Sequence, residues 1–328
     1  MTYFEVLPTH EHVYDRERFL LFFERLADVS NYWYRFVLVT ENGRGTIYMG
    51  CPPNEGAVQS FLSALRTSCP EVEALPADGI PTLGWPSDAA VELCPLSDIL
   101  PLRSDAPEPV FDTAARVLGL GRVDGARGVL EVCFDPLSRR KEKALRDKAN
   151  REIGKLLGLE TKPNLLAQIE RQLGPQALSV SLGKRPTPRA APPRQEAVNP
   201  ANKEMAYAIR ERFASGSRFF RALVRVSVAK PAGAADVLNS LASSLSRGMS
   251  LYNQLVPRTR HGAAARLRKG VLGPWDGGVF SSRELAQLVT VPSADSATGR
   301  HLKSVGSREA APPPEMLDFG DFGVEENE

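Results

Sequence analysis

The Asn42-Gly43 pair constrains the fold most strongly, because it stands between two segments with the composition of strands. Both residues tolerate the positive φ angles that a two-residue hairpin turn requires. The flanking segments, Trp33 to Thr40 and Thr46 to Gly50, are rich in aromatic and β-branched residues. The sequence therefore predicts an antiparallel hairpin near the start of the chain.

An amphipathic helix is predicted on each side of this hairpin. The first follows Asp15 and the second follows Asn54, and both residue types cap helices. Each helix carries aromatic and aliphatic residues at spacings of three and four, which places them on one face. With short strands at Phe4–Leu7 and Glu71–Leu75, the order is βαββαβ, the ferredoxin-like arrangement.

A second set of elements repeats this order. Strands are predicted at Val91–Cys94, Gly128–Phe134, Phe219–Ala229 and Ser250–Val256, with helices at Phe111–Leu118 and Ala232–Ser246. Phe219–Ala229 alternates, with apolar residues on one face opposite Arg221, Leu223 and Arg225. The predicted fold class is α+β, with two ferredoxin-like (βαββαβ) units, the second interrupted by a basic helical insertion.

These elements predict the domain organisation. Residues 1–80 form the first unit, 81–136 together with 218–260 form the second, and 137–217 form the insertion with its Pro-rich linker. Residues 261–309 are predicted as a C-terminal helical extension, with a capping sequence at Ser281 to Glu284 before a helix at Leu285–Leu288. The acidic residues 310–328 have a composition typical of disorder.

The insertion holds most of the basic charge, although the formal net charge of the chain is only +2. A charged helix with a thin apolar stripe is predicted at Leu137–Leu157. It is followed by a helix at Pro163–Leu173, a linker at Gln176–Pro200 and a helix at Ala201–Phe213. Eight residues of the first helix are the candidate nucleic-acid contacts: Arg139, Arg140, Lys141, Lys143, Arg146, Lys148, Arg151 and Lys155.

Two interpretations of this helix remain open. A basic surface can neutralise phosphates and release counterions. Alternatively, the helix is simply solvated, with its charges satisfied by partners such as Glu142–Arg146 and Asp147–Arg151, four residues apart.

No motif for a catalytic, cofactor or metal site is found. The chain has no GxxxxGK[ST] phosphate loop and no GxSxG elbow. Its four cysteines form no CxxC pair, so buried free thiols are expected rather than zinc ligands. His10 and His12 lack a third ligand, so an exposed loop is expected there. We therefore expect no enzyme and no cofactor.

Three passages carry a resemblance. They run from FEVLP to EVEAL in residues 4–75, from FFRALVRVSVA to NQLVPR in residues 219–258, and from FSSRELAQLVTVPS to PPPEM in residues 280–316. Together they resemble the leading, non-ATPase region of TraG-type coupling ATPases and HerA-like DNA translocases of bacterial conjugation, a type IV secretion process. None of the three is a catalytic signature.

The resemblance implies a non-catalytic accessory or assembly protein of conjugative DNA transfer. In the family, the PP passage leads into the motor domain, whereas here the chain reaches Glu328 soon after Pro314, so no catalytic residue can be carried over. The implied partners are a separately encoded ATPase motor or another secretion component, DNA, and a further copy of the chain.

Two alternative functions and a cellular location are also considered. The first rival is a stand-alone nucleic-acid-binding module, and the second is an enzyme with a site between the two units. No leader peptide and no run of about 18 apolar residues is present. A cytoplasmic protein is therefore expected, peripheral to the inner membrane only through a partner.

Overall fold

The first 80 residues contain the predicted order of elements. The computed structural model describes residues 1–29, 32–80, 89–106, 108–121, 127–159, 199–214, 217–229, 233–258 and 277–305. The first elements are β1 (Thr2–Pro8), α1 (Arg16–Val29), β2 (Tyr34–Glu41), β3 (Arg44–Cys51), α2 (Glu55–Ser68) and β4 (Val72–Ala77).

Local sequence signals set the boundaries of these elements as predicted. Asn42 and Gly43 have φ angles of 51° and 77°, and they turn the β2–β3 hairpin. The Asn54 side chain caps α2 by accepting a hydrogen bond of 2.8 Å from the amide of Ala57. Asp15 accepts one of 2.9 Å from the amide of Glu17 at the start of α1.

The second half contains a similar set with helices inserted into it. Its elements are β5 (Ala89–Pro95), α3 (Val110–Val117), β6 (Arg127–Pro136), α4 (Arg139–Leu156), α6 (Pro200–Arg212), β7 (Phe219–Ala229), α7 (Ala234–Gly248) and β8 (Leu255–Arg258). A final segment holds β9 (Gly278–Ser281), α9 (Ser282–Leu285) and the 3-10 turn η2 (Gly299–His301).

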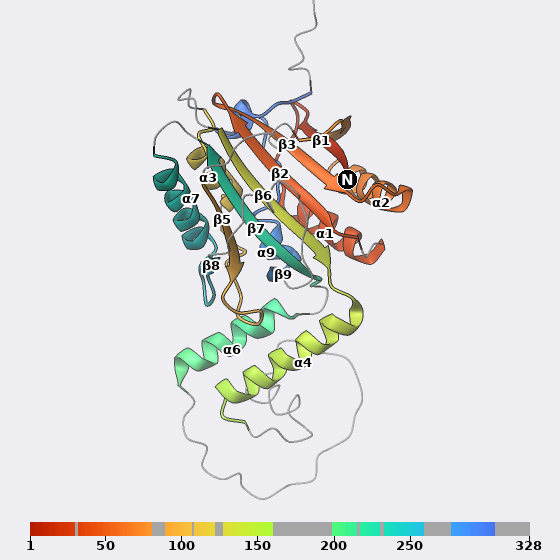
Figure 1. Cartoon of the computed structure of the whole chain (residues 1–328). Helices are drawn as coiled ribbons and strands as arrows, with labels where there is room; N and C mark the ends of the chain where they lie inside the picture. Colours follow the sequence, from red (N-terminus) through yellow and green to blue (C-terminus); the bar gives the residue numbers. More distant parts are fainter. Residues whose placement is uncertain are drawn as a thin grey trace, which may run out of the picture.

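The strands of both halves join in one sheet. Its order is β4-β1-β3-β2-β6-β7-β5-β8, and β9 pairs with β7 beside this path. Each named pair of strands is antiparallel. The two halves meet where β2 pairs with β6, from Tyr34 opposite Phe134 to Glu41 opposite Arg127 (Figure 1). The fold is therefore mixed α+β with a mostly antiparallel sheet.

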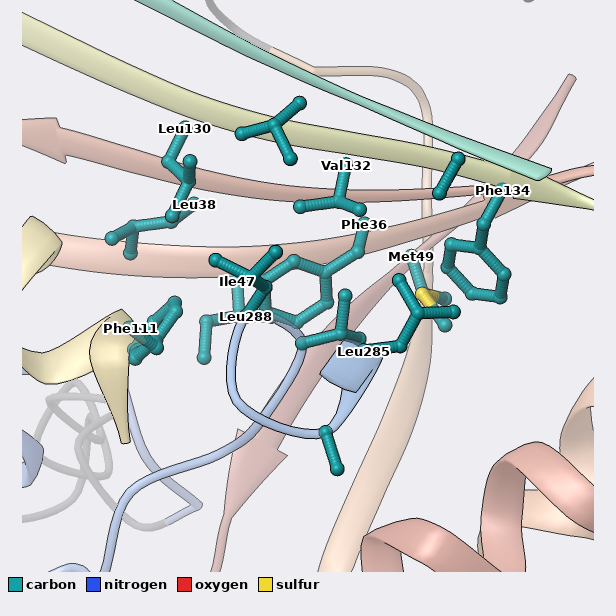
Figure 2. Packing of buried hydrophobic residues seen from close by; sticks show 14 of the residues in the cluster. Phe36, Leu38, Ile47, Met49, Phe111, Leu130, Val132, Phe134, Leu285 and Leu288 are labelled. Atoms are coloured by element: carbon teal, nitrogen blue, oxygen red, sulfur yellow. The ribbon is translucent and has the colours of Figure 1, made fainter. Parts of the chain in front are cut away.

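One face of the sheet carries the largest core. Alternate residues of the strands pack there against the apolar faces of α1, α2, α3 and α7. Phe23 of α1 is fully buried, with its ring centroid 5.5 Å from that of Phe134 and 5.6 Å from that of Phe220. Leu285 and Leu288 of the last segment reach the same core (Figure 2).

Two predictions for the second half need correction, the strand at Ser250–Val256 and the helix at Leu285–Leu288. Residues Ser250 to Gln254 are not a strand, because the Asn253 side chain bonds to backbone atoms of Ser97 and Leu100 and bends the chain around the end of β5. Strand β8 begins at Leu255, and Pro257 lies inside it, which an edge strand tolerates.

The capped helix is also shorter and earlier than predicted. The capping box between Ser281 and Glu284 is present, but α9 ends at Leu285. Strand β9, directly before it, was not predicted. The predicted helix at Pro163–Leu173, the linker at Gln176–Pro200 and the tail from Ala310 lie outside the described residues.

Candidate nucleic-acid interface

Helix α4 follows directly from the end of β6. The side chain of Ser138 caps the helix by accepting a hydrogen bond of 3.4 Å from the amide of Lys141. At the other end, Gly158 adopts a positive φ of 64°, which a glycine reaches without steric cost. The long charged helix expected from the sequence is therefore present at Arg139–Leu156.

The inner face of α4 packs against α6 and the end of the sheet. The apolar stripe predicted from the sequence is buried in a second core. This core comprises Ile99, Leu137, Leu145, Ala149, Ile153, Leu157, Ala206, Ile209 and Phe219. As Figure 1 shows, the two helices lie side by side beyond the end of the sheet. The insertion thus presents its outer surface away from the rest of the fold.

Glu142 anchors α4 to the sheet instead of pairing with Arg146. Its carboxylate is buried and accepts hydrogen bonds of 3.0 Å from Arg218 Nε and 3.1 Å from the amide of Phe219. Arg218 also pairs with Asp28 of α1. The predicted Glu142–Arg146 pair is therefore wrong, since tertiary partners compete successfully for the carboxylate.

Arg146 is bound inside the insertion. Its guanidinium donates to the carbonyl oxygens of Phe213 and Ser217, and its central carbon lies 5.5 Å from the centre of the Phe219 ring. This half-buried guanidinium therefore links α4 to the end of α6 and to Ser217, shortly before β7. Among the eight candidate contacts, Arg146 is thus placed inward.

The other seven candidate contacts are exposed. Arg139 pairs with Asp28 at 3.0 Å, and Lys155 pairs with Glu152 at 3.2 Å. Within the described residues, the remaining five form no ion pair, and the expected Asp147–Arg151 pair is not formed. These five are Arg140, Lys141, Lys143, Lys148 and Arg151. Most of the basic charge of α4 is therefore available to an external anion.

By helical spacing, five of the seven exposed residues lie along one side of α4, and Lys155 among them also pairs with Glu152. We call this set the α4 basic stripe: Arg140, Lys141, Lys148, Arg151 and Lys155. Lys141, Lys148 and Lys155 are each seven residues apart, which is close to two helical turns, so they share one face. At 1.5 Å per residue this row is about 21 Å long. Ala144 lies within the row and carries no bulky side chain to block access.

A buried chain of charges crosses the other face of the sheet and was not predicted. Glu131 of β6 pairs with Arg35 of β2 and, at 3.2 Å, with Arg225 of β7. Arg225 also donates to Glu92 of β5 at 3.1 Å, and all four side chains are at most 1% exposed. Burial by itself lowers the pKa of both guanidiniums, Arg35 and Arg225. The negative charge of Glu131 and the other groups around them outweigh this effect, so the pKa of each is raised above its ordinary value.

This buried chain has a structural role in the geometry observed. Arg225 lies directly opposite Glu131 on one side and Glu92 on the other, whereas Arg35 lies opposite Cys133 and reaches Glu131 diagonally. The only sequence signal was the occurrence of Arg225 and Glu131 inside otherwise apolar strands. A matched set of buried opposite charges orients strands and leaves no charge in surplus for chemistry.

The insertion is tied to the last segment by a second buried cluster. Arg212 at the end of α6 donates to both carboxylate oxygens of Glu284, at 2.9 and 2.8 Å. Glu284 also accepts from the amides of Leu102 and Ser281, at 2.8 and 2.7 Å. Because four hydrogen bonds converge on one carboxylate, α6, α9 and the segment after β5 are fixed together.

The four cysteine side chains are buried in the fold. Cys51, Cys69, Cys94 and Cys133 are free and buried, as expected from the sequence. Burial raises the pKa of Cys51 to about 11 and that of Cys69 to about 12, so neither is a thiolate at neutral pH. The part of the chain that the structure describes holds no group of three or more His, Cys, Asp or Glu that suits a metal ion.

His12 joins the start of the chain to its last segment. It is buried, unlike the exposed loop expected, and its Nε2 donates to the carbonyl oxygen of Val291 at 3.0 Å. Close by, the amide of Ala294 donates to the carbonyl of His12. Burial lowers the pKa of His12 below its ordinary value of 6.5.

This shift predicts a pH dependence of stability. Unfolded His12 takes up a proton below pH 6.5 before the folded form does, so its contribution to stability is lost as the pH falls below that value. The loss is at most about 1.4 kcal/mol per pH unit. Replacing His12 by Gln should remove this part of the pH dependence in urea denaturation between pH 5 and 7.

The comparison with the unchanged protein isolates the effect of His12. Burial raises the pKa of Asp112 to about 6, so Asp112 changes the unfolding free energy with pH in the direction opposite to His12. This contribution is the same in both proteins and cancels in the comparison. Equal slopes of unfolding free energy against pH in the two proteins would contradict the assignment.

An open groove between α3 and α7 is the remaining candidate. It has a volume of about 490 Å³ and is lined by Thr113, Arg116, Val117, Asp236, Val237 and Ser240. Its lining contains no cysteine, histidine or lysine.

No protein-family model matches the chain, and no curated protein matches it significantly. Among the described residues, no helix has both the length and the apolar character required to cross a membrane. A functional proposal therefore rests on the surfaces described above and on the sequence resemblance.

Proposed function

We propose that this protein is a non-catalytic accessory or assembly protein of bacterial conjugative DNA transfer, which contacts nucleic acid through the α4 basic stripe. The observation that carries the proposal is the exposure of this stripe on a helix that is packed against α6 and lies beyond the end of the sheet (Figure 1). Cationic side chains in this arrangement can replace the counterions around phosphates. The buried Arg212–Glu284 and Arg218–Glu142 pairs supply the rigid attachment.

The sheet supports an assembly role with two ferredoxin-like units. The strand order β4-β1-β3-β2 of the first half recurs as β8-β5-β7-β6 in the second. In each half, two helices connect the first strand to the second and the third to the fourth, apart from the insertion. On this interpretation, residues 1–80 are one unit, and residues 81–136 with 218–260 are the other.

The proposed partner is a separately encoded ATPase motor or another secretion component at the cytoplasmic side of the inner membrane. The resemblance of residues 4–75, 219–258 and 280–316 to the region ahead of such a motor supports this choice. In this role the protein would hold DNA near the motor and contribute no bond-breaking step.

The test is affinity purification of the tagged chain from its native cells, with nuclease treatment of half the sample. Recovery of an ATPase with a phosphate loop in both halves supports the accessory role. Its loss after nuclease treatment would mean that DNA alone links the two proteins, which contradicts direct assembly.

The second candidate is a stand-alone nucleic-acid-binding module, and the same stripe favours it. This candidate predicts recovery of nucleic acid without an ATPase. The two candidate functions thus use the same interface and differ in whether an ATPase partner is present.

A further inference from the structure

Resting on the proposed function, we infer that the α4 basic stripe binds the phosphate backbone of double-stranded DNA without reading its sequence. Three of its five residues are lysines, which act as compact point charges on flexible stems. Such groups contact phosphates without the fixed bidentate geometry that guanine recognition uses. The stripe therefore provides charge at regular intervals and little base-specific geometry.

The dimensions of the stripe suit a duplex. The row from Lys141 to Lys155 is about 21 Å long. The major groove of B-form DNA is about 12 Å wide, with a phosphate on each strand about every 3.4 Å of axis. A straight row of this length can reach phosphates on both sides of one groove.

A single strand requires features that α4 does not have. Proteins that bind single strands stack bases on aromatic side chains, and α4 contains no Phe, Tyr or Trp. Among the exposed large hydrophobic side chains of the described residues, the one aromatic is Tyr207 of α6, which is 38% exposed. One such ring makes no platform for successive bases, so the stripe favours the duplex.

The outer face of α4 also differs from that of a membrane-binding helix. Interfacial helices bury large apolar residues in the lipid. In α4 the large apolar residues Leu145 and Ile153 lie in the core shared with α6. The outward residue between the lysines is Ala144, which is too small to anchor the helix in lipid.

The number of contacts predicts the salt dependence of binding. For five phosphate contacts, the slope of log K against log salt is about −4.5 on duplex DNA. Affinity should then fall about 500-fold between 50 and 200 mM salt. Different duplex sequences should bind within about twofold of each other, since phosphates carry no sequence information directly.

The experiment measures fluorescence anisotropy of the full chain with a labelled 20-base-pair duplex and with one of its strands. The variant K148Q/R151Q/K155Q should reduce the magnitude of the salt slope by about 2.7, because three contacts are removed. The control variant R66Q/R103Q/R247Q removes the same charge from exposed positions on other elements, and it should leave the slope nearly unchanged. Circular dichroism melting should show that both variants are folded.

Each alternative gives a distinct result. Tighter binding of the single strand, lost in Tyr207→Ala, would overturn the duplex inference and leave the proposed nucleic-acid contact intact. Sequence-dependent affinities differing more than tenfold would overturn backbone recognition in the same way. Binding to phosphatidylserine vesicles but to neither nucleic acid would overturn both the inference and the proposed function.

Discussion

Replacing Glu131 by glutamine should lower the free energy of unfolding by about 3–5 kcal/mol. The carboxylate of Glu131 lies between two guanidiniums, and its side chain is 0% exposed. Glutamine keeps the shape but removes the negative charge. The two buried guanidiniums of Arg35 and Arg225 would then have only the negative charge of Glu92 in this chain to balance them. Urea denaturation followed by tryptophan fluorescence measures the change.

The matched control for this variant is Glu73→Gln on β4. Glu73 is a strand carboxylate too, but it is exposed, and it forms no ion pair among the described residues. Its replacement should change the unfolding free energy by less than about 0.5 kcal/mol. Equal effects of the two variants would show that the buried charge chain contributes nothing specific to stability.

Replacing Glu284 by alanine should have a comparable effect, again about 3–5 kcal/mol, because it leaves the buried guanidinium of Arg212 without its carboxylate. The amides of Leu102 and Ser281 also lose their acceptor. The two helices of the insertion should loosen first, since Glu284 is their link to the last segment. Compared with the unchanged protein, the variant should therefore show faster amide hydrogen exchange in α6, with a smaller increase in β7.

Glu204→Ala is the control for this second prediction. Glu204 lies on α6 but is exposed. Its replacement should therefore change neither the free energy of unfolding nor the hydrogen exchange of α6 appreciably. Unchanged exchange in α6 of the Glu284→Ala protein would contradict the proposed link. Arg212→Lys tests the geometry separately, because a lysine cannot donate two parallel hydrogen bonds as the guanidinium does.

The Arg212–Glu284 cluster and the contacts that anchor α4 explain how a charged insertion becomes part of a fixed surface. Glu142 and Arg146, which look like solvated helix residues, are used to attach α4 to β7 and α6. The residues left for an external anion are those on the opposite face. The fixed direction of the α4 basic stripe is therefore a property of the packing around it, as the proposed contact with DNA requires.

The sequence alone determined the features that depend on close neighbours in the chain. The Asn42-Gly43 turn, the cap at Asn54 and the box at Ser281 follow from backbone geometry and short-range hydrogen bonds. Helix α4 and strand β7 follow from their hydrophobic periodicity. Such signals are local, so they can be found without knowledge of the rest of the fold.

Only the tertiary structure decided which surfaces meet. Periodicity shows that Arg225 and Leu223 share a face, but it does not show whether that face is covered; both are in fact buried. The junction of β2 with β6 brings together strands whose registers no local signal specifies. The same holds for α4, where long-range partners turned Glu142 and Arg146 inward and left the lysines facing out. The physical reason is that burial and ion pairing depend on groups distant in sequence, whereas turns, caps and periodicity do not.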